Sequence, residues 1–175
     1  MHAIPVIETE RLVLREWREP DVDAYARICA DPRVMRYMWP PRGLTSAEVA
    51  YDVLRLREHW QRHGFGHWAV EERESGRTVG RTGIKRHDDW TLDPDNTEVG
   101  WLYERAAWGK GYATEAAREV VRFCFDELER PEVISISHPD NLGSRRVMEK
   151  VGLSYAGARH WEARSMDVVW YSGRR

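Results

Sequence analysis

The stretch WGKGYATE, from Trp108 to Glu115, follows a strand-like segment and opens an amphipathic helix. Glycine lets the backbone take positive φ and approach a ligand closely. The first amides of a helix lack an intrahelical acceptor, and the helix dipole favours negative charge beside them. The stretch therefore predicts a turn that holds a phosphate or pyrophosphate. A bare Gly-x-Gly also occurs in plain tight turns, and the strand–turn–helix context favours the ligand-binding interpretation.

Two common phosphate-binding motifs do not fit this stretch. A Walker P-loop requires Gly-x4-Gly-Lys-Ser/Thr, whereas here Glu104 stands at the first position and Gly111 follows Lys110. A dinucleotide fingerprint requires a third glycine three residues after the second, where this sequence has Thr114. The phosphate ligand must therefore belong to another class.

Hydrophobic periodicity predicts where the strands and helices of the rest of the chain lie. Residues 11–17 (RLVLREW) alternate as strands do, and Ala117, Val120 and Cys124 share one stripe of a helix. The segments expected to be strands are 11–17, 67–72, 78–85, 98–103, 133–137, 153–156 and 166–171. The segments expected to be helices are about 20–29, 45–62, 113–128 and 141–152. This order predicts a mixed α/β domain.

Composition restricts the class of protein. The 175 residues carry a formal net charge of −2 and 42% hydrophobic residues, which is typical of one globular domain and not of a nucleic-acid-binding surface. Residues 1–10 lack the apolar core of a signal peptide, and no run of about 18 apolar residues occurs. We therefore expect a cytoplasmic protein. Cys29 and Cys124 lie far apart among apolar residues, which favours buried free thiols.

Tryptophan and histidine side chains give two weaker signals. The nine tryptophans favour core packing, with an aromatic substrate cleft as the alternative. Trp39 is the best substrate candidate, because two prolines follow it on an irregular segment. In the series His59, His63 and His67, the first two are four apart on an expected helix and could share a metal, but no HExxH glutamate accompanies them. We expect solvated or substrate-rim histidines and no metal.

The opening stretch resembles the cofactor motif of the GNAT acetyltransferase superfamily, Arg/Gln-x-x-Gly-x-Gly/Ala. Gly111 and Ala113 match its later positions, whereas Trp108 departs from the first. The longer run WGKGYATEA is similar to the branch that includes the RimJ/RimL-type N-terminal acetyltransferases, which tolerates tryptophan there. Further segments resemble the same branch in the same order, namely 8–17, 31–38, 98–103 and 138–153.

This resemblance implies an α/β (α+β) fold and acetyl-CoA as cosubstrate. The sheet would be twisted and mainly antiparallel, with about seven strands, splayed between strands four and five and flanked by about four helices. Residues 1–175 would form a single acetyltransferase domain. The pantetheine arm would lie in the splay, and the pyrophosphate would lie on the glycine turn. The expected cofactor-binding residues are Trp101, Leu102, Tyr103, Trp108, Gly109, Lys110, Gly111, Tyr112, Ala113, Thr114, Asn141 and Ser144.

Two of these residues have equally ordinary interpretations. Asn141 precedes a helix, so it could serve as an N-cap, alone or together with a cofactor contact. Ser144 lies one turn along that helix and could be a solvated surface serine.

Attack of an amine on a thioester requires a base for the amine proton and a donor for the leaving thiolate. An amine is largely protonated at neutral pH, and a carboxylate can accept its proton. Glu98 on the central strand is the expected catalytic base, the alternative being an exposed or arginine-paired acid. Many members of the superfamily supply a tyrosine as donor, but Met148 stands at that position. Ser144 is therefore the favoured catalytic donor, with Tyr103 as a weaker one.

The expected activity is direct transfer of an acetyl group from acetyl-CoA to a primary amine in a ternary complex. The acceptor is either a protein N-terminal α-amine or a small-molecule amine, and the sequence leaves both open. A non-catalytic acyl-CoA-binding or regulatory module is the alternative from another class. We expect no nucleic-acid or membrane partner, and a monomer or homodimer.

Overall fold

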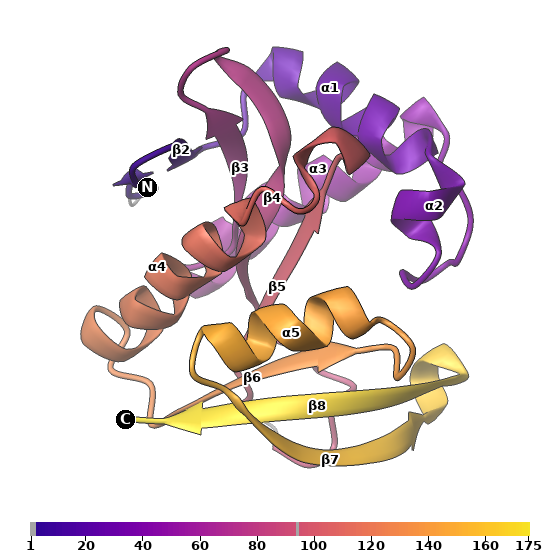
Figure 1. Ribbon diagram of the computed structural model, residues 1–175, viewed down its shortest axis with the longest axis vertical. Coiled ribbons are helices and arrows are strands. Elements are labelled where there is room, and N and C mark those ends of the chain that lie inside the picture. The colour runs from indigo at the N-terminus through magenta and orange to yellow at the C-terminus, as the bar shows by residue number, and fades with distance from the viewer. Residues whose placement is uncertain (1–2, 94) are drawn as a thin grey trace.

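The computed structural model describes residues 3–93 and 95–175, which form a mixed eight-stranded sheet with helices on both faces (Figure 1). The strand order is β1-β2-β3-β4-β5-β6-β8-β7, and every neighbouring pair is antiparallel except β5 and β6. The strands are β1 Ile7–Glu8, β2 Leu12–Arg15, β3 His67–Glu72, β4 Arg77–Lys85, β5 Glu98–Tyr103, β6 Glu132–Ser137, β7 Ser154–Trp161 and β8 Met166–Arg174. The α-helices are α1 Glu19–Ala30, α2 Pro32–Met35, α3 Ser46–His63, α4 Tyr112–Asp126 and α5 Leu142–Lys150. Two 3₁₀ turns are η1 Arg105–Ala107 and η2 Glu162–Arg164.

The predicted fold class is confirmed, and the differences concern short or edge elements. The sheet gains β1, a two-residue strand that pairs with β2. Helix α2 has only four residues, with Asp31 capping its start and Pro32 as its first residue, so no helical period could reveal it. Strand β7 continues to Trp161 instead of ending near residue 156. It lies at the edge of the sheet and is mostly exposed, so its sequence lacks a buried stripe.

The sheet separates two apolar cores. Alternation along β5 places Val99 and Tyr103 in the core that packs under α4, together with Val120. Leu102 joins the opposite core, formed with α1 and α3 around Tyr25. Glu98, Gly100 and Leu102 therefore share the α1/α3 face of β5.

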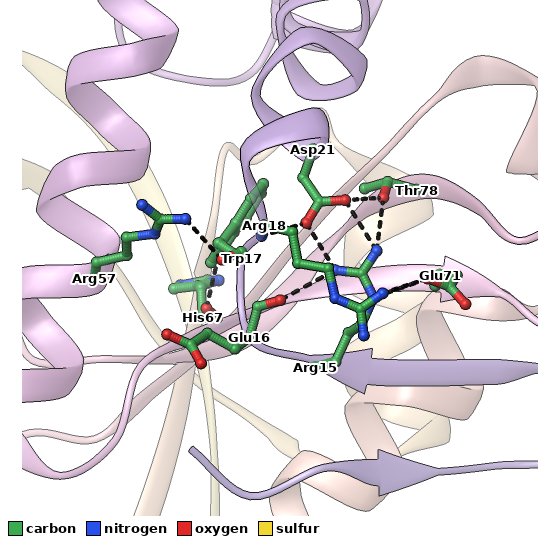
Figure 2. A network of polar contacts seen from close by, with 9 residues as sticks. All are labelled: Arg15, Glu16, Trp17, Arg18, Asp21, Arg57, His67, Glu71 and Thr78. Atoms are coloured by element: carbon green, nitrogen blue, oxygen red, sulfur yellow. Dashed lines mark hydrogen bonds and ion pairs between the residues drawn. The ribbon is translucent and has the colours of Figure 1, made fainter. Parts of the chain in front are cut away.

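A buried ion pair fixes α1 against the sheet (Figure 2). The Arg15 guanidinium donates to both oxygens of Asp21, at 2.7 and 2.9 Å, and to Glu71 at 2.8 Å. Asp21 also accepts from the Thr78 hydroxyl and the Arg18 amide. Burial raises the pKa of Asp21, but these hydrogen bonds outweigh it and hold the pKa below its usual value. The network positions the first turn of α1 over β2 and β3.

The two cysteines are buried free thiols, as the apolar residues around them in the sequence predicted. Cys29 and Cys124 are both buried and unpaired, and burial raises the pKa of Cys124 to about 12. Within the described ranges, no helix combines the length and the apolar composition needed to cross a bilayer.

Strands β5 and β6 meet at their beginnings and then spread apart (Figure 1). One parallel register pair joins them, Glu98 with Ile134, and the Ile134 amide donates to the Thr97 carbonyl at 2.9 Å. The buried Ser135 hydroxyl donates to the Val99 carbonyl at 2.7 Å. The later residues of β5 have register partners only on β4 among the described strands. This confirms the predicted splay between the fourth and fifth expected strands.

Candidate active site

The glycine turn opens α4 as the sequence predicted. Gly109 and Gly111 have φ of 76° and 85°, in the left-handed region that favours glycine. Helix α4 begins at Tyr112, and no side chain caps it. The Glu115 amide donates to the Gly111 carbonyl at 3.0 Å, so the amides before Glu115 have no i−4 acceptor within the helix. These amides provide the anion-binding geometry expected of a helix N-terminus.

The start of the chain holds this turn in place. Glu115 accepts hydrogen bonds from the Thr9 hydroxyl at 2.6 Å, the Arg11 amide at 2.9 Å and the Arg11 Nε at 2.7 Å. The Arg11 Nη1 also donates to the Lys110 carbonyl at 2.8 Å. Burial raises the pKa of Glu115, but these bonds outweigh it and keep the pKa lowered. Sequence reasoning missed Thr9 and Arg11, because they lie about a hundred positions before the helix they anchor.

The other side chains of the turn are tied to neighbouring strands. Trp108 is 52% exposed, and its indole Nε1 donates to the Tyr103 carbonyl at 3.0 Å. The Tyr112 hydroxyl donates to Glu72 at 2.6 Å, and Lys110 lies 3.7 Å from the same carboxylate. These contacts tie the turn to β3 and β5 and use none of its backbone amides within the described residues.

A groove of about 720 Å³ begins beside Gly111 and Thr114 and continues along α4. Two acids of its lining are paired with arginines, since Glu115 lies 2.6 Å from Arg11 and Glu119 lies 2.6 Å from Arg122. Two further basic residues of the lining form no ion pair among the described residues, namely Arg118 and Lys150. Arg118 donates to the Lys150 carbonyl at 3.4 Å, which joins α4 to α5.

The opposite wall begins at α5. The Asn141 side chain accepts from the Ser144 amide at 3.2 Å, so its capping role is confirmed. Ser144 is half-buried, and its hydroxyl makes no hydrogen bond within residues 3–93 and 95–175. Met148 is fully buried between α5 and Tyr171, so its side chain belongs to the core.

The middle of β5 presents backbone at the splay and sends its side chains elsewhere. Trp101 packs against the α4 core and also against the Met148 cluster. Leu102 points into the α1/α3 core. The Tyr103 hydroxyl lies in the α4 core, 2.6 Å from the Thr82 hydroxyl, and burial raises its pKa. Tyr103 therefore does not present its hydroxyl as a proton donor at the splay.

Glu98 stands at the point where β5 and β6 separate. The residue is only 8% exposed and lies directly across from Lys85 on the neighbouring strand. The two side chains form no ion pair in the described part of the chain, and Glu98 Oε2 instead lies 3.4 Å from His87 Nε2. Glu98 is thus neither an exposed acid nor an arginine-paired one. Sequence reasoning missed His87, because its loop carries no motif.

The loop after α2 reaches the far side of the splay. Trp39 is 56% exposed on this loop, as expected for an irregular segment. The ring of Tyr37 lies 5.2 Å from the ring of His138, which directly follows β6. Tyr37 is a second residue that the sequence did not single out, because only the fold brings it next to His138.

The expectation of a solvated or rim histidine was wrong for His67. His67 is buried beside Arg81, and burial together with that cation holds its pKa well below the usual value. His59 is half-buried: its Nδ1 lies 2.8 Å from the Phe65 carbonyl, and its Nε2 accepts from the Arg86 amide. Both are structural, whereas His63 is half-exposed. The described residues contain no cluster of three metal-ligating side chains.

Comparison with known proteins agrees with this geometry. A family model described as an acetyltransferase (GNAT) domain matches residues 11–154. An Aspergillus fumigatus protein named FsC-acetyl coenzyme A-N(2)-transacetylase is 31% identical over 156 residues, covering 87% of this chain and 66% of that protein. An acetyltransferase structure from Agrobacterium tumefaciens has a TM-score of 0.83 at 27% identity, covering 100% and 97% of the two chains. A RimL structure in complex with coenzyme A shares the fold, with a TM-score of 0.77 at 15% identity and coverage of 97% and 98%. These findings confirm the family that the motifs predicted, so the chain belongs to the GNAT family and is an N-acetyltransferase.

Proposed function

We propose that this chain, as a single domain over residues 1–175, transfers an acetyl group from acetyl-CoA to a primary amine in a ternary complex. The observation that carries the proposal is the free-amide turn at the start of α4, beside strands that separate after one register pair. A family match supports acyl transfer in general. The turn and the splay favour a cosubstrate with a pyrophosphate and a narrow arm.

The proposed contacts with the cosubstrate mainly use polar and charged groups that lack a partner among the described residues. The pyrophosphate would accept from the amides of residues 109–114, where the helix dipole favours negative charge. The arm would lie along the backbone of residues 101–103, with Asn141 and Ser144 on the other wall. The unpaired cations Arg118 and Lys150 would suit a further phosphate in the groove.

The chemistry requires one proton acceptor and one donor. Glu98 takes a proton from the acceptor ammonium, and the freed amine nitrogen attacks the acetyl carbonyl carbon. A C–N bond forms as the C–S bond breaks, and the second proton lost by the acylated nitrogen passes to the sulfur, so coenzyme A leaves as its thiol and Glu98 returns its proton to solvent. The unused Ser144 hydroxyl donates a hydrogen bond to the departing sulfur, in place of the tyrosine that Met148 replaces.

The acceptor amine is a protein N-terminal α-amine or a small-molecule amine. RimL is named as an α-N-protein acetyltransferase, which supports the first class. The Trp39 loop is the proposed acceptor surface, because its indole is exposed and the loop contacts His138 beside the splay. An aromatic face of this kind can hold either class of substrate.

The rival function is a non-catalytic acyl-CoA-binding module. A buried carboxylate is costly unless it is paired, and among the described residues Glu98 has only the 3.4 Å contact with His87. This observation favours an enzyme.

Release of free thiol from acetyl-CoA, measured with a panel of amines, tests the proposal. The panel should contain amino acids, polyamines and short peptides that differ in their first residue. We expect amine-dependent thiol release, with the acetylated product confirmed by mass spectrometry. Tight acetyl-CoA binding without release for any amine would favour the regulatory module instead.

A further inference from the structure

We infer that His87 is a positioning residue that orients Glu98 for the amine, an inference that rests on the proposed role of Glu98 as base. His87 is 8% exposed and belongs to the loop after β4. Its two ring nitrogens face two different side chains. Nε2 lies 3.4 Å from Glu98 Oε2, and Nδ1 lies 3.4 Å from Arg164 Nη2.

The partners of His87 fix its tautomer. A guanidinium has donors only, so the Nδ1 that faces Arg164 must carry the lone pair. The ring proton of neutral His87 therefore sits on Nε2 and points to Glu98. Asp89 lies 4.0 Å from Nδ1, too far for a hydrogen bond that would reverse this assignment.

The backbone of His87 is clamped by an amide side chain. The Asn96 Oδ1 accepts from the His87 amide at 2.9 Å, and the Asn96 Nδ2 donates to the His87 carbonyl at 2.8 Å. Asn96 is 1% exposed, so water does not compete for these two bonds. These two bonds hold the loop backbone at His87 in the way that the backbone hydrogen bonds of a neighbouring strand would.

The ring of His87 is held as well. It packs edge-on against Trp161, with centroids 5.0 Å apart and planes at 82°. The Arg164 guanidinium lies 4.4 Å from the centroid of the same indole. Trp161 ends β7 and Arg164 lies in η2, so the far edge of the sheet holds the imidazole. Several independent contacts on one side chain are expected where function requires a single orientation of that side chain.

The Glu98 carboxylate lies close over Gly100 as well as beside this imidazole. A Cβ on Gly100 would lie 3.0 Å from Glu98 Oε1 and 3.2 Å from Oε2, so the carboxylate folds back over Gly100. His87 holds Oε2, and Oε1 has no hydrogen-bond partner in the described part of the chain. Oε1 is therefore the oxygen available to the acceptor ammonium.

Other charged side chains surround the His87–Glu98 pair, so a pH profile of the enzyme needs a control variant. Around the pair, β4 and its loop supply Lys85 and Asp89, η2 supplies Arg164, α3 supplies His59 and β3 supplies His67. A donor to a carboxylate favours its charged form. Loss of the His87 donor should therefore let protonation silence the base at higher pH.

The test compares His87→Ala with His87→Gln, whose side-chain amide can donate in place of Nε2–H. We expect His87→Ala to lower kcat roughly 10- to 100-fold, the loss of one hydrogen bond to a charged group. Acetyl-CoA affinity should stay unchanged, and the acidic limb of the kcat/KM profile should move to higher pH. His87→Gln should recover most of the rate and restore the limb. His160→Gln, on the exposed part of β7, is the control.

The Glu98→Gln variant, measured in the same experiment, separates failure of the proposed base from failure of the positioning role of His87. Wild-type kinetics in Glu98→Gln would remove the proposed base. A slow Glu98→Gln together with a wild-type profile in His87→Ala would overturn the positioning role, as would equal damage in both His87 variants. If His87→Ala does not fold, Arg164→Met decides, because it removes the donor that faces Nδ1 and leaves His87 itself unchanged. An unchanged pH profile in a folded Arg164→Met would then count against the proposal.

Discussion

Glu98 is the residue on which the proposed chemistry depends. Its carboxylate is buried beside an imidazole, and Lys85 directly opposite does not pair with it in the described structure. A carboxylate with an unused oxygen in such a place can take a proton from a substrate. Its neighbours, not its position in the sequence, distinguish it from the other acids.

Substituting Glu98 by glutamine keeps the shape and removes the base. We expect turnover to fall by about 10²–10⁴-fold, the usual contribution of a positioned general base. Acetyl-CoA affinity, measured by calorimetry, should stay near the wild-type value, because Glu98 lies away from the glycine turn. Glu162→Gln is the matched control on an 86% exposed side chain. Equal kcat values for wild type and Glu98→Gln across the pH range would reject the role.

His59 links folding stability to pH. Its Nδ1 faces the Phe65 carbonyl and its Nε2 accepts from an amide, so the bonds require a neutral ring. Burial lowers the pKa of His59 from 6.5 to about 4. Below pH 6.5 the unfolded chain binds a proton that the folded protein takes up only near pH 4. The free energy of unfolding should therefore decrease across this window as acid is added.

Comparison with His59→Asn isolates this effect from other titrating groups. The stability advantage of wild type over the variant should shrink by about 1–2 kcal/mol between pH 7.5 and pH 4, after allowance for solvent screening. Urea unfolding monitored by tryptophan fluorescence measures it. His160→Asn removes an exposed imidazole and serves as control. A difference that stays constant over the pH range would contradict the buried, neutral assignment.

The glycine turn acts as an element, since its effect comes from several amides and one helix dipole. Gly111→Glu places a carboxylate where the pyrophosphate would lie and forces a side chain into a φ of 85°. We expect acetyl-CoA binding to weaken by at least about 100-fold, since like charges at contact distance cost a few kcal/mol. Gly76→Glu is a matched control, because Gly76 has a φ of 66° and open space around it in the β3–β4 turn. If both variants lose binding equally, backbone strain and not phosphate contact explains the loss.

Elements with a strong period were predictable and short ones were not. Strands β3 and β5 match their expected ranges at both ends, because each alternates or buries a continuous β-rich run. Helix α3 begins after Thr45, whose capping box with Glu48 is visible in the sequence. The four-residue α2 and the exposed edge strand β7 lack such signals.

The residues of the candidate site likewise divide into those that the sequence predicted and those that it did not. Motifs that are contiguous in the chain, such as the turn at Gly111 and the cap at Asn141, could be predicted with their local geometry. The surroundings of Glu98 could not, because His87 and Arg164 are 77 positions apart and carry no motif. Only the pairing of β8 with β6 brings the β7–β8 connection to the splay. Long-range contacts of this kind depend on the fold as a whole.

At the scale of the whole molecule, the sheet consists of two halves that pair at the start of β5 and β6, while α4 packs across to β6 and α5. Strands β1 to β5 form one half with α1, α3 and α4, and β6 to β8 form the other with α5. The junction contains the Glu98–Ile134 pair and the buried Ser135 bond. A ligand in the splay would contact both halves at once, through the α4 turn and through α5.

This architecture predicts that acetyl-CoA stabilises the protein as one unit. At 100 times its dissociation constant, a ligand that binds only the folded state adds about 2.7 kcal/mol. For a chain of this length, that corresponds to a rise in Tm of roughly 5–10 °C. Hydrogen exchange should slow together along the open edge of β5, at the start of α4 and at the start of α5. Protection confined to one half would mean that the ligand lies outside the splay, because a bridging arm must order both walls.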